Sequence, residues 1–181
     1  RQPTAERLAY LYLLQPAWAA LTIVAACLVY PYAFHWLAAF DLVAGAFAAC
    51  LILLFLPLVT TSAMNPLLVA IFMRSKKHIE QLDAGSGRVF FVSTVGSVAG
   101  VLITAFGLIP YVSNFTATLI VAVVLALLSL AAALRPPVPV ANRGALIAWG
   151  VAATVASVGL LWQSDRYLDR MWPAHYAGTE W

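Results

Sequence analysis

Charged residues divide this chain into long apolar runs. No Asp, Glu, Lys or Arg occurs between Leu42 and Met73, between Val89 and Leu134, or between Gly144 and Ser164. Each run is longer than the ~20 apolar residues that an α-helix needs to cross the hydrocarbon core of a membrane. The pattern predicts an all-α fold, a polytopic transmembrane helix bundle with about five membrane-spanning helices. The expected helices lie near residues 4–30, 42–73, 88–109, 113–134 and 143–163.

The composition excludes an ordinary soluble domain. Of the 181 residues, 64% are hydrophobic and 9% are charged, whereas about 25% are charged in a typical soluble domain. We therefore expect residues 1–164 to form a transmembrane domain with the lipid bilayer as its main partner. The net charge of +3 fits basic loops at a membrane surface, and we expect no nucleic-acid partner.

The placement of basic residues predicts an orientation. If each helix crosses the membrane once, one side receives eight of the ten Lys and Arg residues, namely Arg1, Arg7, Arg74, Lys76, Lys77, Arg88, Arg135 and Arg143. The other side receives only Arg166 and Arg170. Because cytoplasmic loops are rich in Lys and Arg, the N-terminus and the loop 74–88 are expected in the cytoplasm and the tail 165–181 outside. We expect a multi-pass protein of the bacterial inner (plasma) membrane.

Two prolines interrupt the longest apolar run. Residues 42–73 would span about 48 Å as one straight helix at ~1.5 Å per residue, and Pro57 and Pro66 bracket a polar patch. A single kinked or broken helix is expected, with two half-membrane segments as the alternative. Broken helices can free backbone groups for a substrate, so the candidate substrate-binding residues are Thr60, Thr61, Ser62 and Asn65. Alternatively, the hydroxyls bond to their own helix and Asn65 bridges to a neighbour.

The stretch GSGRVFFVSTVGSVAGVLITAFGLIP, residues 85–110, could be a glycine-rich phosphate loop or a packing helix. A dinucleotide loop needs a strand before it and an amphipathic helix after it. Here a charged loop ending in Gly85-Ser86-Gly87 precedes a helix from about Arg88 that is apolar all round. In lipid, small residues on one helix face let a second helix approach closely. The candidate packing residues are Ser93, Gly96, Ser97, Gly100, Thr104 and Gly107.

The remaining polar and reactive residues predict no reaction centre. Asp41 is expected to cap the helix that starts at residue 42, and His35 and Trp36 to act as interfacial anchors. Cys27 and Cys50 have no CxxC spacing and are interpreted as small buried hydrophobic residues. The spans contain no HExxH motif and no carboxylate pair. We therefore expect no catalytic residue, no metal site and no cofactor in this chain.

The middle of the chain resembles the membrane domain of fused spermidine synthase-like proteins. The resemblance is clearest over residues 51–134, in Leu56-Pro57, Met64-Asn65-Pro66-Leu67, a charged loop and the stretch 85–110. In that family a transporter-like membrane region precedes a soluble domain related to the aminopropyltransferases. The positions that match the family's pattern in order are Gly87, Phe90 or Phe91, Ser93-Thr94, Gly96-Ser97, Gly100 and Leu108-Ile109-Pro110.

The resemblance implies that this chain is the membrane portion of such a protein. A soluble synthase-like domain, linked to polyamine chemistry, would then follow Trp181, and the chain would anchor or serve it without being catalytic itself. Other transmembrane helices or subunits are further expected partners. Two other hypotheses stay open: part of a small-molecule transporter with a site near Thr60–Asn65, and a structural membrane subunit that packs through Gly96 and Gly100.

Overall fold

The computed structural model describes residues 5–37, 41–75, 80–135 and 142–176. These residues are almost entirely helical, and the described part of the chain contains no β-strand, which confirms the all-α fold. The elements are α1 (Ala5–Leu37), α2 (Leu42–Ser62), α3 (Met64–Ser75), α4 (Glu80–Leu102), the π-helix η1 (Ile103–Leu108), α5 (Asn114–Leu134), α6 (Arg143–Trp162) and α7 (Ser164–Tyr176).

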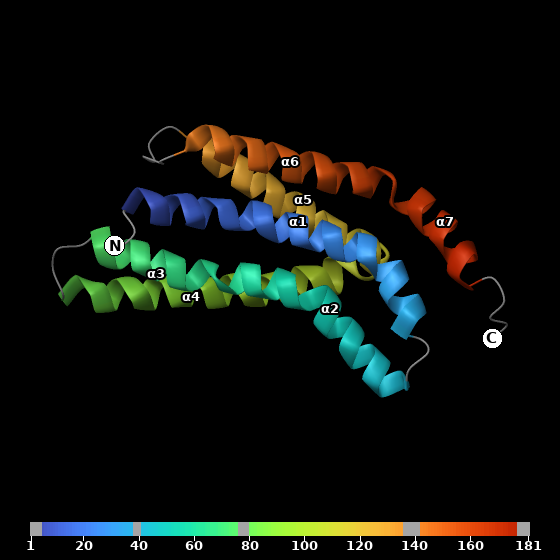
Figure 1. The fold of residues 1–181 in the computed structure, drawn as a ribbon. Helices are drawn as coiled ribbons and strands as arrows, with labels where there is room; N and C mark the ends of the chain where they lie inside the picture. Colours follow the sequence, from blue (N-terminus) through green and yellow to red (C-terminus); the bar gives the residue numbers. More distant parts are fainter. Residues whose placement is uncertain (1–4, 38–40, 76–79, 136–141, 177–181) are drawn as a thin grey trace.

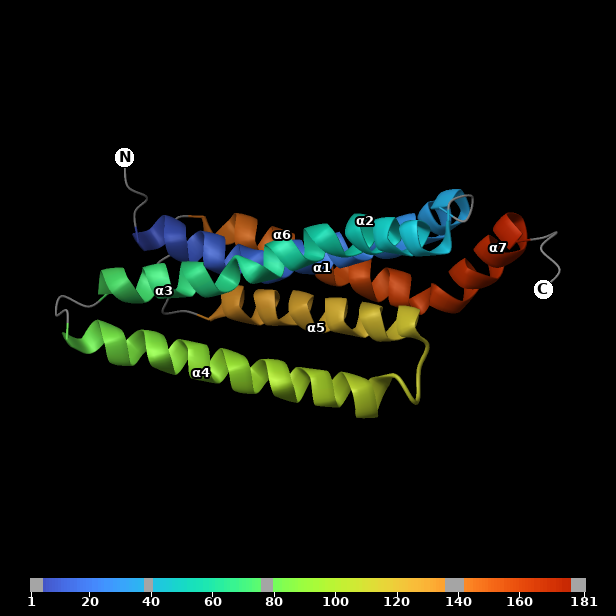
Figure 2. The same cartoon turned by 90° about the horizontal axis from the view of Figure 1, so that it is seen from below.

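Five helical segments are long and apolar enough to cross a membrane. They are Glu6–Leu37, Val43–Ile71, Gly87–Leu108, Asn114–Leu134 and Arg143–Trp162. Successive segments run in opposite directions along a common axis (Figures 1 and 2). One end of the bundle therefore collects the start of α1, the end of α3, the start of α4, the end of α5 and the start of α6. This arrangement is that of a multi-pass membrane protein.

The core of the bundle lies between α1, α5 and α6, which all pack against one another. Its buried positions recur at alternating steps of three and four residues, the spacing of a helix seam in a left-handed bundle. Small side chains fill most of them, so the helix backbones lie close together. These positions are Ala17, Ala20, Val24 and Cys27 on α1, Leu119, Ala122, Ala126 and Ser129 on α5, and Leu146, Gly150, Ala153 and Ser157 on α6.

Helices α5 and α6 approach closely at Gly150. A Cβ atom placed on Gly150 would lie 3.3 Å from the Cα and 3.4 Å from the backbone N of Leu130. One residue earlier on α5, the buried Ser129 hydroxyl donates to the carbonyl of Leu13 at 3.0 Å, which links α5 to α1. At one end, the guanidinium of Arg143 donates to the carbonyls of Ala133 (3.0 Å) and Leu134 (2.7 Å), so it satisfies the end of α5.

Helix α1 is longer than predicted. The expected stop at Tyr30 is wrong, because α1 continues through the buried Pro31 to Leu37. A proline removes one backbone donor, but a transmembrane helix tolerates it where neighbouring groups pack around the break. The ring of Tyr30 lies 4.8 Å from that of Phe34 and 6.3 Å from that of Phe115 on α5, centroid to centroid. Figure 1 shows α1 bending near this end.

Residues 42–73 form one bent helical segment, the first of the two predicted alternatives. Only Ala63 separates α2 from α3, and its backbone stays near helical values (φ −68°, ψ −14°). The Ala63 N–H donates to Val59 at 3.2 Å, and the Leu67 N–H donates to Ala63 at 3.3 Å. Helical hydrogen bonds therefore continue across the junction. At the other end, the Asp41 carboxylate accepts the Val43 N–H at 3.3 Å, which confirms the predicted cap.

Helix α4 starts earlier than predicted. It begins at Glu80, so Gly85-Ser86-Gly87 lies inside the helix and not in a loop before it. Each glycine costs only about 1 kcal/mol in a helix interior, which a long helix can absorb. The helix then widens into η1, where the Ile109 N–H donates to the carbonyl of Thr104 at 3.0 Å, five residues back. Figure 2 shows α4 running along one side of the bundle, and its helix neighbour is α3.

Candidate functional site

The threonines of the predicted substrate patch bond to their own helix. The Thr60 hydroxyl lies 2.9 Å from the carbonyls of both Leu56 and Pro57. The Thr61 hydroxyl lies 2.8 Å from the carbonyl of Pro57 and 3.1 Å from that of Leu58. Such bonds bend a helix slightly and leave the hydroxyl hydrogen engaged. For these two residues, the structure agrees with the alternative to substrate binding, in which the hydroxyls bond to their own helix.

Asn65 bridges two helices. Its side-chain amide on α3 lies next to the Ser93 hydroxyl on α4, with the amide N 3.3 Å and the amide O 3.4 Å from Ser93 Oγ. The structure therefore brings together one residue of the predicted substrate patch and one of the predicted packing face. An asparagine side chain can form up to four hydrogen bonds, and Asn65 is exposed on the surface of this chain. The pair is a polar contact that joins α3 to α4.

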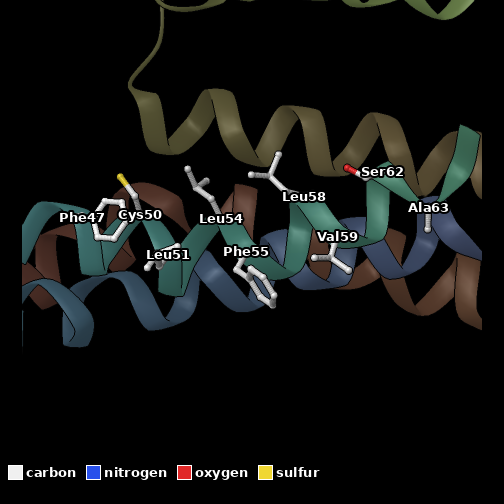
Figure 3. Close-up of a pocket in the computed structure, with 9 residues that line it drawn as sticks. All are labelled: Phe47, Cys50, Leu51, Leu54, Phe55, Leu58, Val59, Ser62 and Ala63. Carbon is white, nitrogen blue, oxygen red and sulfur yellow. The ribbon is translucent and has the colours of Figure 1, made fainter. Parts of the chain in front are cut away.

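A groove of about 580 Å³ lies on the outer face of α2 (Figure 3). Leu54, Leu58 and Ser62 point to one side of the helix, and Phe55 and Val59 point to the other. The Ser62 hydroxyl is the polar group at one end of an otherwise apolar lining. This chemistry suits an acyl chain or another apolar helix and offers no charge to a polyamine. The groove is lined by Phe47, Cys50, Leu51, Leu54, Phe55, Leu58, Val59, Ser62 and Ala63.

The two cysteines lie in different environments. Cys27 is buried in the core, as predicted, but the prediction for Cys50 is wrong because this side chain is exposed. Its position on the outer face of α2 explains the difference. That face is apolar throughout, and a face in contact with lipid has the same composition as a buried one.

Within the described residues, Gly96 and Gly100 of the predicted packing face on α4 lie against no other helix, whereas Ser93 of the same face contacts Asn65 on α3. A Cβ atom placed on Gly96 or Gly100 would meet nothing within 4 Å, and Ser97 is exposed. Thr104 and Gly107 lie in η1, where the wider turn rotates them relative to the α-helical face. That another helix packs closely on Gly96 and Gly100 stays a prediction, and that helix would belong to a second chain or lie outside the described residues.

The seam that the structure does contain was not singled out from the sequence. It joins α1, α5 and α6, and it includes contacts between aromatic rings at both ends. Trp18 and Trp149 lie 5.1 Å apart, and Phe115 stacks on Tyr167 at 6.0 Å, centroid to centroid. The signal for this seam was present, because Gly150, Ala153 and Ser157 repeat small residues at three- and four-residue steps.

Comparison with known proteins adds no identification. No family model, no curated protein and no solved structure matches this chain. Among the described residues, no three His, Cys, Asp or Glu side chains gather where they could hold a metal ion. His35 and Trp36 are exposed at the end of α1, a position compatible with the predicted interfacial role.

Proposed function

We propose that the chain is the integral membrane domain of a spermidine synthase-like protein, which anchors or serves a soluble domain and is not catalytic itself. The observation that carries the proposal is how the polar groups of the spans are used. Thr60 and Thr61 donate to their own helix, and Asn65 pairs with Ser93. Polar groups engaged in this way stabilise a scaffold. The resemblance over residues 51–134 supplies the family.

The proposed orientation places the basic end of the bundle in the cytoplasm of a bacterium. Arg7, Arg88 and Arg143 lie on helices that start there, and Arg135 directly follows the end of α5. Asp41 and α7 belong to the opposite end. The positive-inside rule then supports a cytoplasmic N-terminus and an outer position for residues 165–181. The cosubstrates of an ordinary spermidine synthase, which resemble S-adenosylmethionine, are cytoplasmic, so a soluble domain on that side is proposed to act differently.

The test of this function is the composition of the native complex. An antibody against residues 165–176 should precipitate, from native membranes, a synthase-like domain on the same polypeptide or on a tightly bound one. Mass spectrometry identifies its peptides, and precipitation in the presence of excess competing peptide is the control. The purified 181-residue chain should show no aminopropyl transfer to a diamine. Recovery of this chain without any such domain would contradict the proposal.

A transporter is the second candidate, and the exposure of Asn65 favours it, because this amide can form more hydrogen bonds than the one it shares with Ser93. If the chain carries a substrate such as a polyamine, Asn65→Leu should abolish uptake into proteoliposomes, because the amide is the polar group that reaches across two helices. Thr60→Val is the matched control, since the Thr60 hydroxyl bonds only within its own helix. Unchanged uptake by a correctly folded Asn65→Leu variant excludes this site from transport.

A further inference from the structure

Helix α7 begins where the last membrane span ends. The span closes at Trp162, which is 84% exposed, and tryptophan is typical of the boundary between membrane and water. Gln163 forms the turn, and the Tyr167 N–H donates to its carbonyl at 2.8 Å as α7 starts. In both views α7 leaves the direction of α6 (Figures 1 and 2). Helix α7 therefore starts directly at the end of the last apolar span.

The described part of α7 has two distinct faces. Ser164 is buried, and Tyr167 and Leu168 are half-buried. The charged residues of the first two turns are all exposed, namely Asp165, Arg166, Asp169 and Arg170. The five spans, by contrast, are apolar all round. A helix with one apolar and one charged face is the form that lies in a membrane interface.

Tyr167 fixes how α7 is rotated about its own axis. Its hydroxyl donates to the carbonyl of Leu28 on α1 at 2.9 Å, and its ring stacks on Phe115 of α5. Burial raises the pKa of the Tyr167 hydroxyl, with a smaller contribution from Tyr32 and Cys27. These contacts turn the Tyr167 side of α7 toward the end of the bundle. The charged face consequently points away from the protein.

The exposed charges of α7 form two ridges. Arg166 and Arg170 are four residues apart and lie side by side on one flank, and Asp165 and Asp169 do the same on the other. No ion pair joins these four side chains to one another or to another residue of the described ranges. Two adjacent guanidinium groups that form no ion pair with the neighbouring Asp165 and Asp169 are suited to a phosphate, which they bind through parallel hydrogen bonds.

We propose that α7 is an interfacial helix whose Arg166–Arg170 ridge binds the phosphates of phospholipid headgroups. The apolar side rests on the bundle and on the edge of the hydrocarbon core, and the acidic ridge faces water. Because α7 directly follows the span of α6, it lies close to the membrane surface. The guanidinium groups of Arg166 and Arg170 provide the hydrogen-bond donors for the phosphates. The depth of α7 does not depend on the proposed orientation. That orientation decides only which leaflet is bound, the outer one.

The depth of two neighbouring side chains tests the proposal. Leu168→Cys and Asp169→Cys are each introduced into the full chain with Cys50→Ala, where the buried Cys27 does not react with a polar spin label. In vesicles of phosphatidylethanolamine and phosphatidylglycerol, the label at 168 should be relaxed more by oxygen and less by a water-soluble nickel complex than the label at 169. Equal and strong relaxation of both labels by nickel would mean that α7 projects into water, which overturns the proposal.

Charge removal separates phosphate binding from simple amphipathicity. In the Leu168→Cys protein, Arg166→Gln with Arg170→Gln should make the label more accessible to the nickel complex, because the contact that holds the helix to the headgroups is lost. Asp165→Asn with Asp169→Asn removes the same number of charges and should cause no such change. Equal effects of the two pairs overturn the phosphate contact. If reporter fusions show that the orientation is the reverse of the proposed one, α7 lies in the inner leaflet, and the expected depths of both labels stay the same.

Discussion

Gly150→Leu should prevent the core of α1, α5 and α6 from forming, whereas Gly159→Leu in the same helix should leave it intact. The backbone of Leu130 lies 3.3 Å from the position that a Cβ on Gly150 would take, and nothing lies within 4 Å of the equivalent position on Gly159. A leucine at 150 would force two helix backbones apart. Overpacking of this kind typically costs 1–3 kcal/mol and more when the obstacle is backbone, because a packed interface cannot absorb the volume.

The measurement is the thermal unfolding of the purified protein in a mild detergent, followed by size-exclusion chromatography. Gly150→Ala should fall between the parent and Gly150→Leu, since one methyl group needs a shift of only a few tenths of an ångström at 3.3 Å. Gly159→Leu shares the helix, the residue type and the added volume. If Gly150→Leu melts at the temperature of the parent, the contact between α5 and α6 is not as close as described.

The same measurement separates the two glycine-rich faces. Gly100→Leu should leave the isolated chain as stable as the parent, because a Cβ at this position meets no neighbour. A loss of association in the native membrane, with the fold intact, would then locate a partner helix on α4 and favour the structural-subunit hypothesis. The residues that the sequence pointed to and those that hold this chain together are therefore distinguishable by experiment.

The membrane spans could be predicted because they depend mainly on one free energy, the cost of leaving backbone N–H and C=O groups without hydrogen bonds in lipid. The apolar runs between charged residues became helical, since an unpaired backbone group in lipid costs several kcal/mol and only helices satisfy all of them in one segment. The Asp41 cap followed from the same local rules. The end of α1 and the start of α4 were not predicted correctly. Pro31 and Gly87 predict helix ends because proline and glycine usually interrupt helices in water-soluble proteins. A helix held by its neighbours continues through both.

The candidate site was harder to predict because small residues look alike in every helix. Gly96 and Gly100 on α4 and Gly150 on α6 carry the same local pattern, and only the packing of distant helices decides which is covered. The contact of Asn65 with Ser93 joins residues 28 positions apart and likewise depends on how α3 meets α4. Cys27 and Cys50 differ for the same reason. Apolar sequence does not distinguish a lipid-facing position from a core position.

The orientation has an all-or-none readout. Reporter proteins fused after Ser75 and after Trp172 should lie on opposite sides of the membrane, the first in the cytoplasm and the second outside. The end of α3 and the whole of α7 lie at opposite ends of the bundle, as Figure 1 shows. Three spans, the segments 87–108, 114–134 and 143–162, separate the two fusion points. An odd number of crossings must change sides.

A cytoplasmic enzyme and a periplasmic one, each active only in its own compartment, provide the measurement at both positions. Moving the fusion from Ser75 to Asn142 is the matched control, because two further spans return the chain to the side of Ser75. Both original fusions on one side would mean that one of these three apolar helices does not cross. A reversed pair would keep every crossing and invert the orientation. Arg88, Arg135 and Arg143 would then face outward against the usual bias of Lys and Arg toward the cytoplasm.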